Sequence, residues 1–492
     1  MTAPADPATA TALHVEAPSV APSPGEQLSV GLPRVVAEAL RTDPAPAPSG
    51  TQSLASMARA DGVRYLLATF TTLTGKPCSK LVPVAAADEL QAEGCGFAGY
   101  AAGAMGQVPA DPDVVAVPDL SSYTPLPFVR PGLAMVHCDP HVNGVPYAFA
   151  PRVVLREQLR RADDLGLSLS VGAEVEYFLV RRGADGRLVT ADASDDADQP
   201  CYDARGVTRM YDHLAAVSDA MDELGWGPYA SDHEDGNGQF EQNFHHADAL
   251  TTADRVTTLR YVIQMLAEQR GMIATYMPKP FTDRTGSGMH LHLSLWGAAA
   301  AGGGARFPAS GADVHGLGLS PLGYSFVGGL LEHAPAIQAL IAPTVNSYKR
   351  SGATSTTSGA TWAPRRATYG GNDRTHLIRV PDAHRVELRS GDGAASSHLA
   401  AAAALGAGLD GVRRDLDPGA PGARPDGAPQ LPRTLLDAVA ALEADPVVSG
   451  VLDAVDPSAG VSAYYAELKR EEFYAWHSRV SDWEVDRYLT SV

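Results

Sequence analysis

The chain has 492 residues, of which 45% are hydrophobic, so it is long enough for more than one core and too apolar to be disordered throughout. Its formal net charge of -19 at pH 7 would repel nucleic-acid phosphates and anionic lipid headgroups, so we expect neither partner. Four cysteines without a CxxC pair, no signal-peptide pattern and no apolar run of about 18 residues favour a protein of the reducing cytoplasm.

Composition divides the sequence into three segments. Residues 1–50 are rich in Ala, Pro, Ser and Thr, which predicts a disordered tail. Residues 51–147 hold short apolar runs between Gly and Pro turns, which predict the strands of a small sheet domain. Residues 148–492 predict a larger, mixed α and β domain, because strand candidates alternate there with helical spacing that starts at Pro151. Its longer helices are expected over 207–224, 252–268 and 321–341.

Four predicted strands of the larger domain carry polar side chains two residues apart, so that each strand has one polar face. These pairs and triplets are Glu174 and Glu176; Gln239, Glu241 and Asn243; His290, His292 and Ser294; Arg385, Glu387 and Arg389. One such strand alone is most often an ordinary solvated face. Four together predict the lining of an open barrel or a curved sheet that ligands enter.

Glu234 adds a further carboxylate to this lining, which then offers five carboxylates and at least one imidazole. Oxygen-rich ligation without cysteine suits Mg²⁺ or Mn²⁺ better than zinc, and two cations would balance the charge. Arginines crowd the stretch 350–389, with Arg350, Arg374, Arg379 and Arg389 among them. One arginine alone is as readily a surface charge or a structural ion pair, but the group indicates phosphoryl chemistry assisted by metal. Neither a P-loop nor a Rossmann glycine motif is present.

Seven separated blocks, in this order, resemble the glutamine synthetase family over residues 52–492. They are GAEVEYFL at Gly172, HEDGNGQFE at His233, MPKPF at Met277, GSGMHLHLS at Gly286, NSYKR at Asn346, NDRTHLIRVP at Asn372 and RVELR at Arg385. The resemblance implies an α+β fold, with an amino-terminal β-grasp domain before a catalytic domain whose curved antiparallel sheet is backed by helices. It also implies a ring homo-oligomer, expected to be a dodecamer, with sites between subunits.

The resemblance further implies a role for each site residue. Glu176, Glu234 and Glu241 would hold one metal, and Glu174, His290 and Glu387 a second metal beside the ATP phosphates. Arg350 and Arg389, with the backbone of Gly286, would hold the carboxylates of glutamate, and His290 would lie beside this substrate. Arg374 would stabilise the transferred phosphoryl group, and Arg379, His292 and Ser294 would lie on the nucleotide side. The implied reaction is ATP-dependent ligation of an amine to the γ-carboxylate of L-glutamate through γ-glutamyl phosphate.

The sequence departs from the family where ammonium would bind. Ammonia-using relatives carry an Asp where this chain has Ala98, and a flap Glu where residues 351–359 read SGATSTTSG without an acid. Thr285 replaces an Asn that contacts glutamate. Neutral, small side chains weaken ammonium binding and leave space for carbon, so we expect a small alkylamine as acceptor, as in the γ-glutamylmethylamide synthetase branch.

Three alternatives stay open at this point. Another acid, such as Asp111 or Asp113, would preserve ordinary glutamine synthesis from ammonia. A ring-forming homologue without catalysis is a second alternative, although an unused set of buried carboxylates would be costly to retain. A guanidino kinase shares the catalytic sheet but would stop after phosphoryl transfer.

Overall fold

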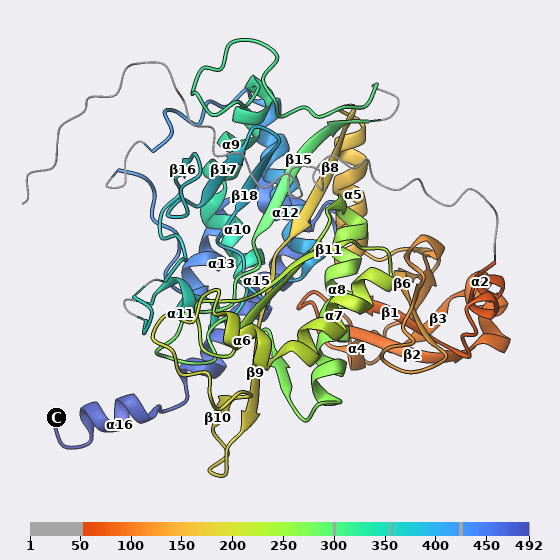
Figure 1. Ribbon diagram of the computed structural model, residues 1–492. Helices are drawn as coiled ribbons and strands as arrows, with labels where there is room; N and C mark the ends of the chain where they lie inside the picture. Colours follow the sequence, from red (N-terminus) through yellow and green to blue (C-terminus); the bar gives the residue numbers. More distant parts are fainter. Residues whose placement is uncertain (1–52, 299–301, 354–355, 360, 423–426, 492) are drawn as a thin grey trace, which may run out of the picture. The chain divides into compact units, whose positions relative to one another are not determined.

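Figure 1 shows the computed structural model of the chain, which describes residues 53–298, 302–353, 356–359, 361–422 and 427–491. The tail expected over residues 1–50 lies outside the described residues. None of the helices in the described ranges is long and apolar enough to cross a membrane.

The first part of the described chain forms a seven-stranded sheet with short helices beside it. Its strands follow the order β2-β1-β6-β4-β3, and β5 and β7 also pair with β6. The central pair, β1 and β6, is parallel, with Tyr65 beside Leu133. The elements are α2 (Leu54–Ala60), β1 (Tyr65–Thr71), β2 (Pro77–Pro83), η1 (Val84–Ala86), α3 (Ala87–Glu93), β3 (Cys95–Phe97), α4 (Gly99–Ala102), β4 (Val114–Pro118), η2 (Leu120–Ser122), β5 (Thr124–Pro125), β6 (Leu133–Val142) and β7 (Val145–Pro146).

Two further sheets form the part that carries the predicted site. One has the order β10-β9-β12-β11 with β14 on β9, and the other has the order β13-β8-β15-β18-β17-β16. In the described residues these strands pair antiparallel, apart from β16 and β17. The strands are β8 (Leu167–Ala173), β9 (Val175–Arg182), β10 (Leu188–Thr190), β11 (Pro228–His233), β12 (Gln239–Phe244), β13 (Ala247–Asp248), β14 (Ile273–Thr275), β15 (Leu291–Gly297), β16 (Tyr369–Gly370), β17 (Ile378–Asp382) and β18 (Arg385–Leu388).

The two sheets meet at Glu174, the single residue between β8 and β9, so the chain passes from one sheet to the other there. The lining expected from the sequence as one curved sheet is therefore hydrogen-bonded as two sheets that share this junction. Because the polar strands belong to both sheets, their polar faces converge on the junction.

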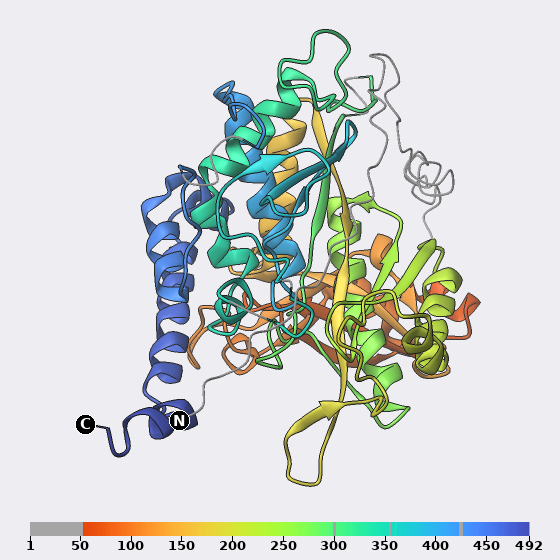
Figure 2. The same ribbon diagram turned by 60° about the vertical axis from the view of Figure 1, so that its left-hand side comes forward.

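Helices pack behind the sheets, with α12 in contact with both α5 and α9 (Figures 1 and 2). The helices are α5 (Pro151–Asp163), α6 (Ala204–Arg209), α7 (Tyr211–Glu223), α8 (Ala249–Glu268), α9 (Pro321–Glu332), α10 (Ala334–Ile341), α11 (Ser347–Ser351), α12 (Ser397–Arg413), α13 (Leu435–Ala444), α14 (Pro446–Leu452), α15 (Val461–His477) and α16 (Asp482–Tyr488). The backbones of α9 and α12 approach closely, because a Cβ atom on Gly329 would lie 2.1 Å from the carbonyl oxygen of Ala407. Glycine is therefore required at that crossing.

Candidate active site

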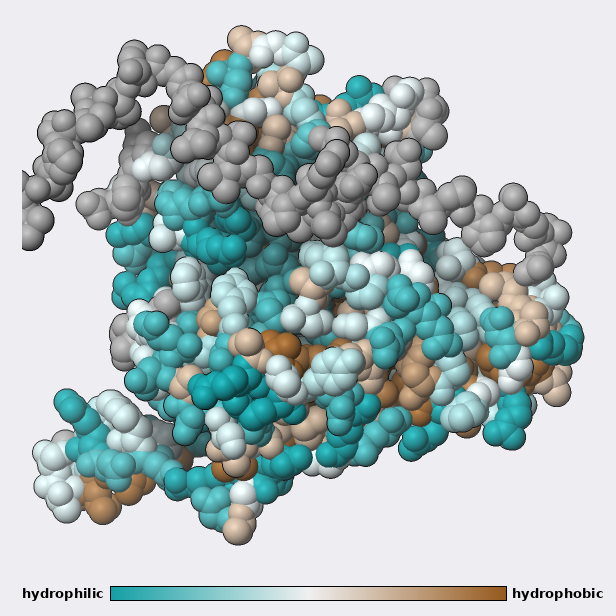
Figure 3. Space-filling view, viewed as in Figure 1, coloured by the Kyte–Doolittle hydropathy of each residue, from teal (hydrophilic) through white to brown (hydrophobic). Residues whose placement is uncertain are grey.

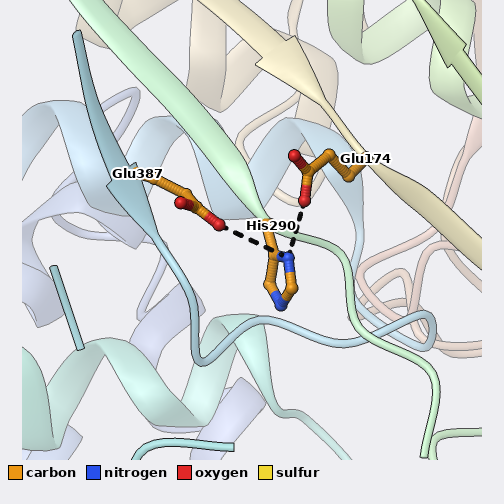
Figure 4. Close-up of side chains that lie close together, drawn as sticks. All are labelled: Glu174, His290 and Glu387. Atoms are coloured by element: carbon orange, nitrogen blue, oxygen red, sulfur yellow. Dashed lines mark hydrogen bonds and ion pairs between the residues drawn. The ribbon is translucent and has the colours of Figure 1, made fainter. Parts of the chain in front are cut away.

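Glu174, His290 and Glu387 form a first cluster at the junction of the two sheets (Figure 4). Strand register brings them together, because Leu291 of β15 pairs with Ala173 on one side and with Leu388 on the other. The His290 Nδ1 atom lies 2.7 Å from Glu174 Oε2 and 3.6 Å from Glu387 Oε1. Burial alone would raise the pKa of Glu174, but the imidazoles of His292 and His290 hold it well below the ordinary value.

Glu176, Glu234 and Glu241 form a second cluster, in which one carboxylate oxygen from each residue lies within 4.8 Å of the others. Glu241 of β12 pairs directly with Glu176 of β9, and Glu234 follows β11. Burial and then the charges of neighbouring carboxylates raise the pKa of Glu234 and Glu241 well above the ordinary value. Three carboxylates this close repel one another unless a cation lies between them.

His290 stands between the two clusters. Its Nε2 atom lies 4.0 Å from Glu176 Oε1, and within the described part of the chain this buried atom has no hydrogen-bond partner. A buried ring nitrogen without a partner, beside oxygen-rich clusters that lack cysteine, fits divalent cations such as Mg²⁺ or Mn²⁺. Gly288 keeps this space open, because a Cβ atom there would lie 2.8 Å from Glu176 Oε1 and 2.9 Å from His290 Nε2.

The predicted arginines surround the clusters unevenly. Arg389 is buried and donates to Glu387, whose other oxygen accepts from Arg379 at 2.7 Å. Arg350 is also buried and donates to the carbonyl oxygen of Ser390 at 3.2 Å. Arg374 instead lies exposed at the wall of a cavity of about 490 Å³. Two of the four arginines are thus fixed against one cluster carboxylate, and one faces open space.

The glycine block before β15 packs tightly around Arg350. A Cβ atom on Gly286 would lie 2.2 Å from the carbonyl oxygen of Pro278 and 2.9 Å from Cγ of Arg350. Thr285, the preceding residue, donates from its hydroxyl to Asp235 Oδ2 at 2.8 Å. The segment is therefore held close to both the buried arginine and the second cluster.

His292 and Ser294 continue the polar face of β15 away from His290. His292 Nε2 lies 2.7 Å from Glu174 Oε1, and its Nδ1 accepts from Arg385 at 3.2 Å. The Ser294 hydroxyl accepts from the indole N–H of Trp296 at 3.0 Å. His292 thus connects to the first cluster, whereas Ser294 bonds along its own strand.

Four residues that contact or face the second cluster or its turn were not chosen from the sequence. Gln239 donates to Glu176 at 2.8 Å, and Asp235 accepts from Trp362 Nε1 at 2.9 Å. Tyr202 has a positive φ of 63°, and burial, then Cys201 and Glu234, raise its pKa to about 12. Strand spacing signals Gln239, since it shares the face of β12 with Glu241; the others lie on turns and loops, where strand spacing predicts nothing.

Comparison with known proteins places this arrangement in a family. The model of the glutamine synthetase catalytic domain matches residues 148–488. The chain belongs to the glutamine synthetase family. Members of the family are ATP-dependent ligases, and the chain is one of them.

Individual members of the family resemble the chain along most of its length. It is 42% identical to a glutamine synthetase of Rhizobium leguminosarum bv. phaseoli, over 89% of this chain and 99% of that protein. It is 40% identical to a glutamate–methylamine ligase of Methyloversatilis universalis, over 87% of this chain and 96% of that protein. A structure described as a GmaS/ADP complex superimposes with a TM-score of 0.83 at 44% identity, over 89% of this chain and 99% of that chain.

Proposed function

We propose that the chain joins a small alkylamine, methylamine foremost, to the γ-carboxylate of L-glutamate at the expense of ATP. The observation that carries the proposal is the pair of clusters that meet at His290, with arginines beside them. Ser358 belongs to a stretch of sequence without an acid, residues 351–359, and it bonds to Asp235 next to Glu234. The similarity to a glutamate–methylamine ligase and to the GmaS structures supports the alkylamine over ammonia. Ammonia remains the second candidate, because a relative of equal similarity is a glutamine synthetase.

The first half of the reaction activates the carboxylate, which is a poor acyl donor. The γ-carboxylate oxygen attacks the terminal phosphorus of ATP, the bond to the bridging oxygen of ADP breaks, and γ-glutamyl phosphate forms. Arg350 and Arg389 are proposed to hold the carboxylates of glutamate, and Arg389 is already oriented by its bond to Glu387. Arg374 is proposed to approach the transferred phosphoryl group, and Arg379 and His292 to contact the nucleotide.

Glu176, Glu234 and Glu241 would hold one divalent cation, and Glu174, His290 and Glu387 another. Such cations, when bound, neutralise charge on the phosphate oxygens. The protein positions these ligands from fixed strands, and hydrogen bonds set the carboxylates: Glu176 accepts from the Gly288 N–H at 2.7 Å and from Gln239. Rigid support of this kind keeps the ligands in place before substrate arrives.

In the second half, a neutral amine attacks the acyl carbon and phosphate leaves. The amine arrives largely as its ammonium ion, so it needs a site that accepts a cation and takes its proton. The second cluster and Asp232 supply negative charge there, and burial with the nearby carboxylates raises the pKa of Asp232 to about 6. Residues 356–359 read TTSG, and small side chains of this kind would leave space for a methyl group.

The same chain is proposed to assemble as a ring homo-oligomer in the cytoplasm. Its carboxy-terminal end carries large apolar side chains that its own described residues leave exposed, such as Val480 (77%), Trp483 (63%) and Leu489 (76%). Figure 3 shows hydrophobic atoms on this end of the chain, at the lower left, among hydrophilic ones. A second copy of the chain is the partner that would cover them.

A panel of acceptors tests the function. Phosphate release from ATP with glutamate and Mg²⁺ is measured with no amine, ammonia, methylamine, ethylamine and ethanolamine, and the products are identified by mass. We expect N-methylglutamine to form with the highest kcat/KM. A preference for ammonia would make the enzyme a glutamine synthetase, and a stable phosphorylated nitrogen compound would make it a kinase. Glu176→Ala serves as the control that should release no phosphate.

A further inference from the structure

Asp235 links three separate segments next to the second cluster. Its Oδ2 atom accepts from the Thr285 hydroxyl at 2.8 Å, from the Trp362 indole N–H at 2.9 Å and from the Ser358 hydroxyl. Its backbone N–H donates to Glu234 Oε2 at 3.2 Å. The side chain is buried, with 6% of its surface exposed. A carboxylate with this many donors on one oxygen is fixed in position, and it fixes the groups that donate to it.

Trp362 is held in a conformation that a large side chain rarely adopts. Its φ is 54°, in the left-handed region, and 44% of the residue is exposed. A backbone in this region costs free energy, and the hydrogen bond from the indole to Asp235 helps to stabilise it. The neighbouring Thr357 is tied down as well, because its N–H donates to the carbonyl oxygen of Asp283 at 2.8 Å.

Trp362 and Arg374 both line the cavity of about 490 Å³. The indole N–H bonds to Asp235, the residue after Glu234. Trp362 thus lies in the wall of the cavity that Arg374 also lines, and Arg374 is the arginine proposed to act on the phosphoryl group. An aromatic face at such a place attracts an ammonium ion and gives apolar contact to a methyl group on it. Ammonia has no carbon with which to use that contact.

We propose that Asp235 holds the segment of Ser358 and Trp362 against the turn of Glu234, and that Trp362 is the aromatic wall of the acceptor site that favours methylamine over ammonia. Asp235 is then a positioning residue and Trp362 a specificity-determining one. The inference rests on the proposed function for its substrate, but the hydrogen bonds of Asp235 are independent of it. A rival role for Asp235, direct binding of the amine cation, would affect ammonia and methylamine alike.

The first experiment measures kcat and KM for methylamine and for ammonia in the full-length enzyme and in Trp362→Ala and Trp362→Phe. Trp362→Ala should raise the KM for methylamine about fivefold or more and leave that for ammonia within about twofold. Trp362→Phe keeps an aromatic face and should lose less of the preference. Tyr211→Ala, which removes another exposed aromatic ring, should change neither value. An unchanged ratio between the two amines in Trp362→Ala would overturn the role of the indole.

The second experiment reads the position of the segment without any amine. Trypsin cleavage after the exposed Arg365 is timed in the wild type, in Asp235→Ala and in Trp362→Phe. Both variants lose the bond between the indole and Asp235, so both should be cleaved several times faster than wild type. Unchanged cleavage in both, or an equal fall in the use of both amines by Asp235→Ala, would overturn the positioning role. A wild type that prefers ammonia would refute the proposed function and the role of the indole, and the trypsin result would still decide the role of Asp235.

Discussion

Three carboxylates of the second cluster lie close enough to repel one another in the metal-free protein. Glu241 is buried among them, with 8% of its surface exposed, and its pKa is raised by burial and by Glu174, Glu234 and Glu176. An amide of the same shape would remove one charge without leaving a cavity. We therefore expect Glu241→Gln to raise the apparent Tm of the metal-free protein by a few degrees, while it abolishes ligase activity.

The same substitution should weaken the stabilisation that Mg²⁺ gives. A ligand at about 100 times its Kd stabilises the folded state by about 2.7 kcal/mol, so wild type should show a clear rise in Tm with Mg²⁺ and Glu241→Gln a much smaller one. Thermal unfolding in EDTA and in Mg²⁺ measures both. Glu223→Gln, at an exposed position near the end of α7, is the matched control and should keep the full rise. An equal rise in Glu241→Gln would remove this residue from the metal site.

At the scale of elements, two helices that the sequence predicts as continuous are each divided into two helices in the structure. Residues 321–341 were expected as one helix, but the structure has α9 and α10 with His333 between them. Pro335 in the first turn of α10 has no N–H to continue a helix, which accounts for the break. The helix expected over 207–224 was likewise wrong in extent, because α6 and α7 are separated at Met210.

The break at His333 places an imidazole between two other helices. Its Nδ1 lies 2.7 Å from Asp445, which caps α14, and its Nε2 lies 2.9 Å from Asp410 of α12. Burial disfavours the charged ring, but the hydrogen bonds to Asp445 and Asp410 outweigh it and raise the pKa of His333. The imidazolium therefore stabilises the packing of α12 and α14 fully below about pH 6.5, and this contribution is lost as the pH rises through the raised pKa.

We expect His333→Gln to lower the free energy of unfolding by about 2 kcal/mol at pH 6 and by less at pH 9. Gln keeps hydrogen-bonding groups but carries no charge at either pH, so the difference between the two values isolates the imidazolium. Thermal unfolding of both proteins across pH 6 to 9 measures it. His384→Gln, at an exposed position, should change stability at neither pH. A loss that is constant with pH would mean that His333 acts only through packing.

At the scale of the molecule, spacing along strands predicted which side chains meet at the site, and it could not predict what fixes them. The period of two residues predicts Glu176, Glu241 and Glu387 on strands that pair side by side, and it predicts Glu174 and His290 directly beside the ends of such strands. The bonds of Asp235 to Ser358 and Trp362 join positions 123 and 127 residues apart, between turns and loops without a period. Such contacts depend on how distant loops are brought together when the chain folds, and the composition or periodicity of one segment does not predict this.

A buried arginine, Arg152, makes hydrogen bonds across the domain boundary that composition predicts between residues 147 and 148. Arg152 of α5 is 3% exposed and donates to Asp254 of α8 at 2.8 Å, to Asp139 of β6 at 2.6 Å and to Asp119 at 2.7 Å. His137 and Arg152, together with the hydrogen bond from His398, hold the pKa of Asp254 far below its usual range, against its burial. One guanidinium thus ties the first sheet to two helices behind the second part of the chain.

Arg152→Met should therefore lower the free energy of unfolding by about 3 to 5 kcal/mol, because it leaves Asp254 buried without its cation. Arg156 also pairs with Asp119 and Asp139 but is 41% exposed, so Arg156→Ala should cost about 1 kcal/mol or less. Urea unfolding measures both values, and hydrogen exchange shows where the loss falls. If exchange rises in β6 while α8 keeps its protection, the first sheet unfolds as a unit and the predicted boundary holds. If β6 and α8 lose protection together, the two parts unfold as one cooperative unit, and the predicted boundary marks a change in composition but not a boundary between domains.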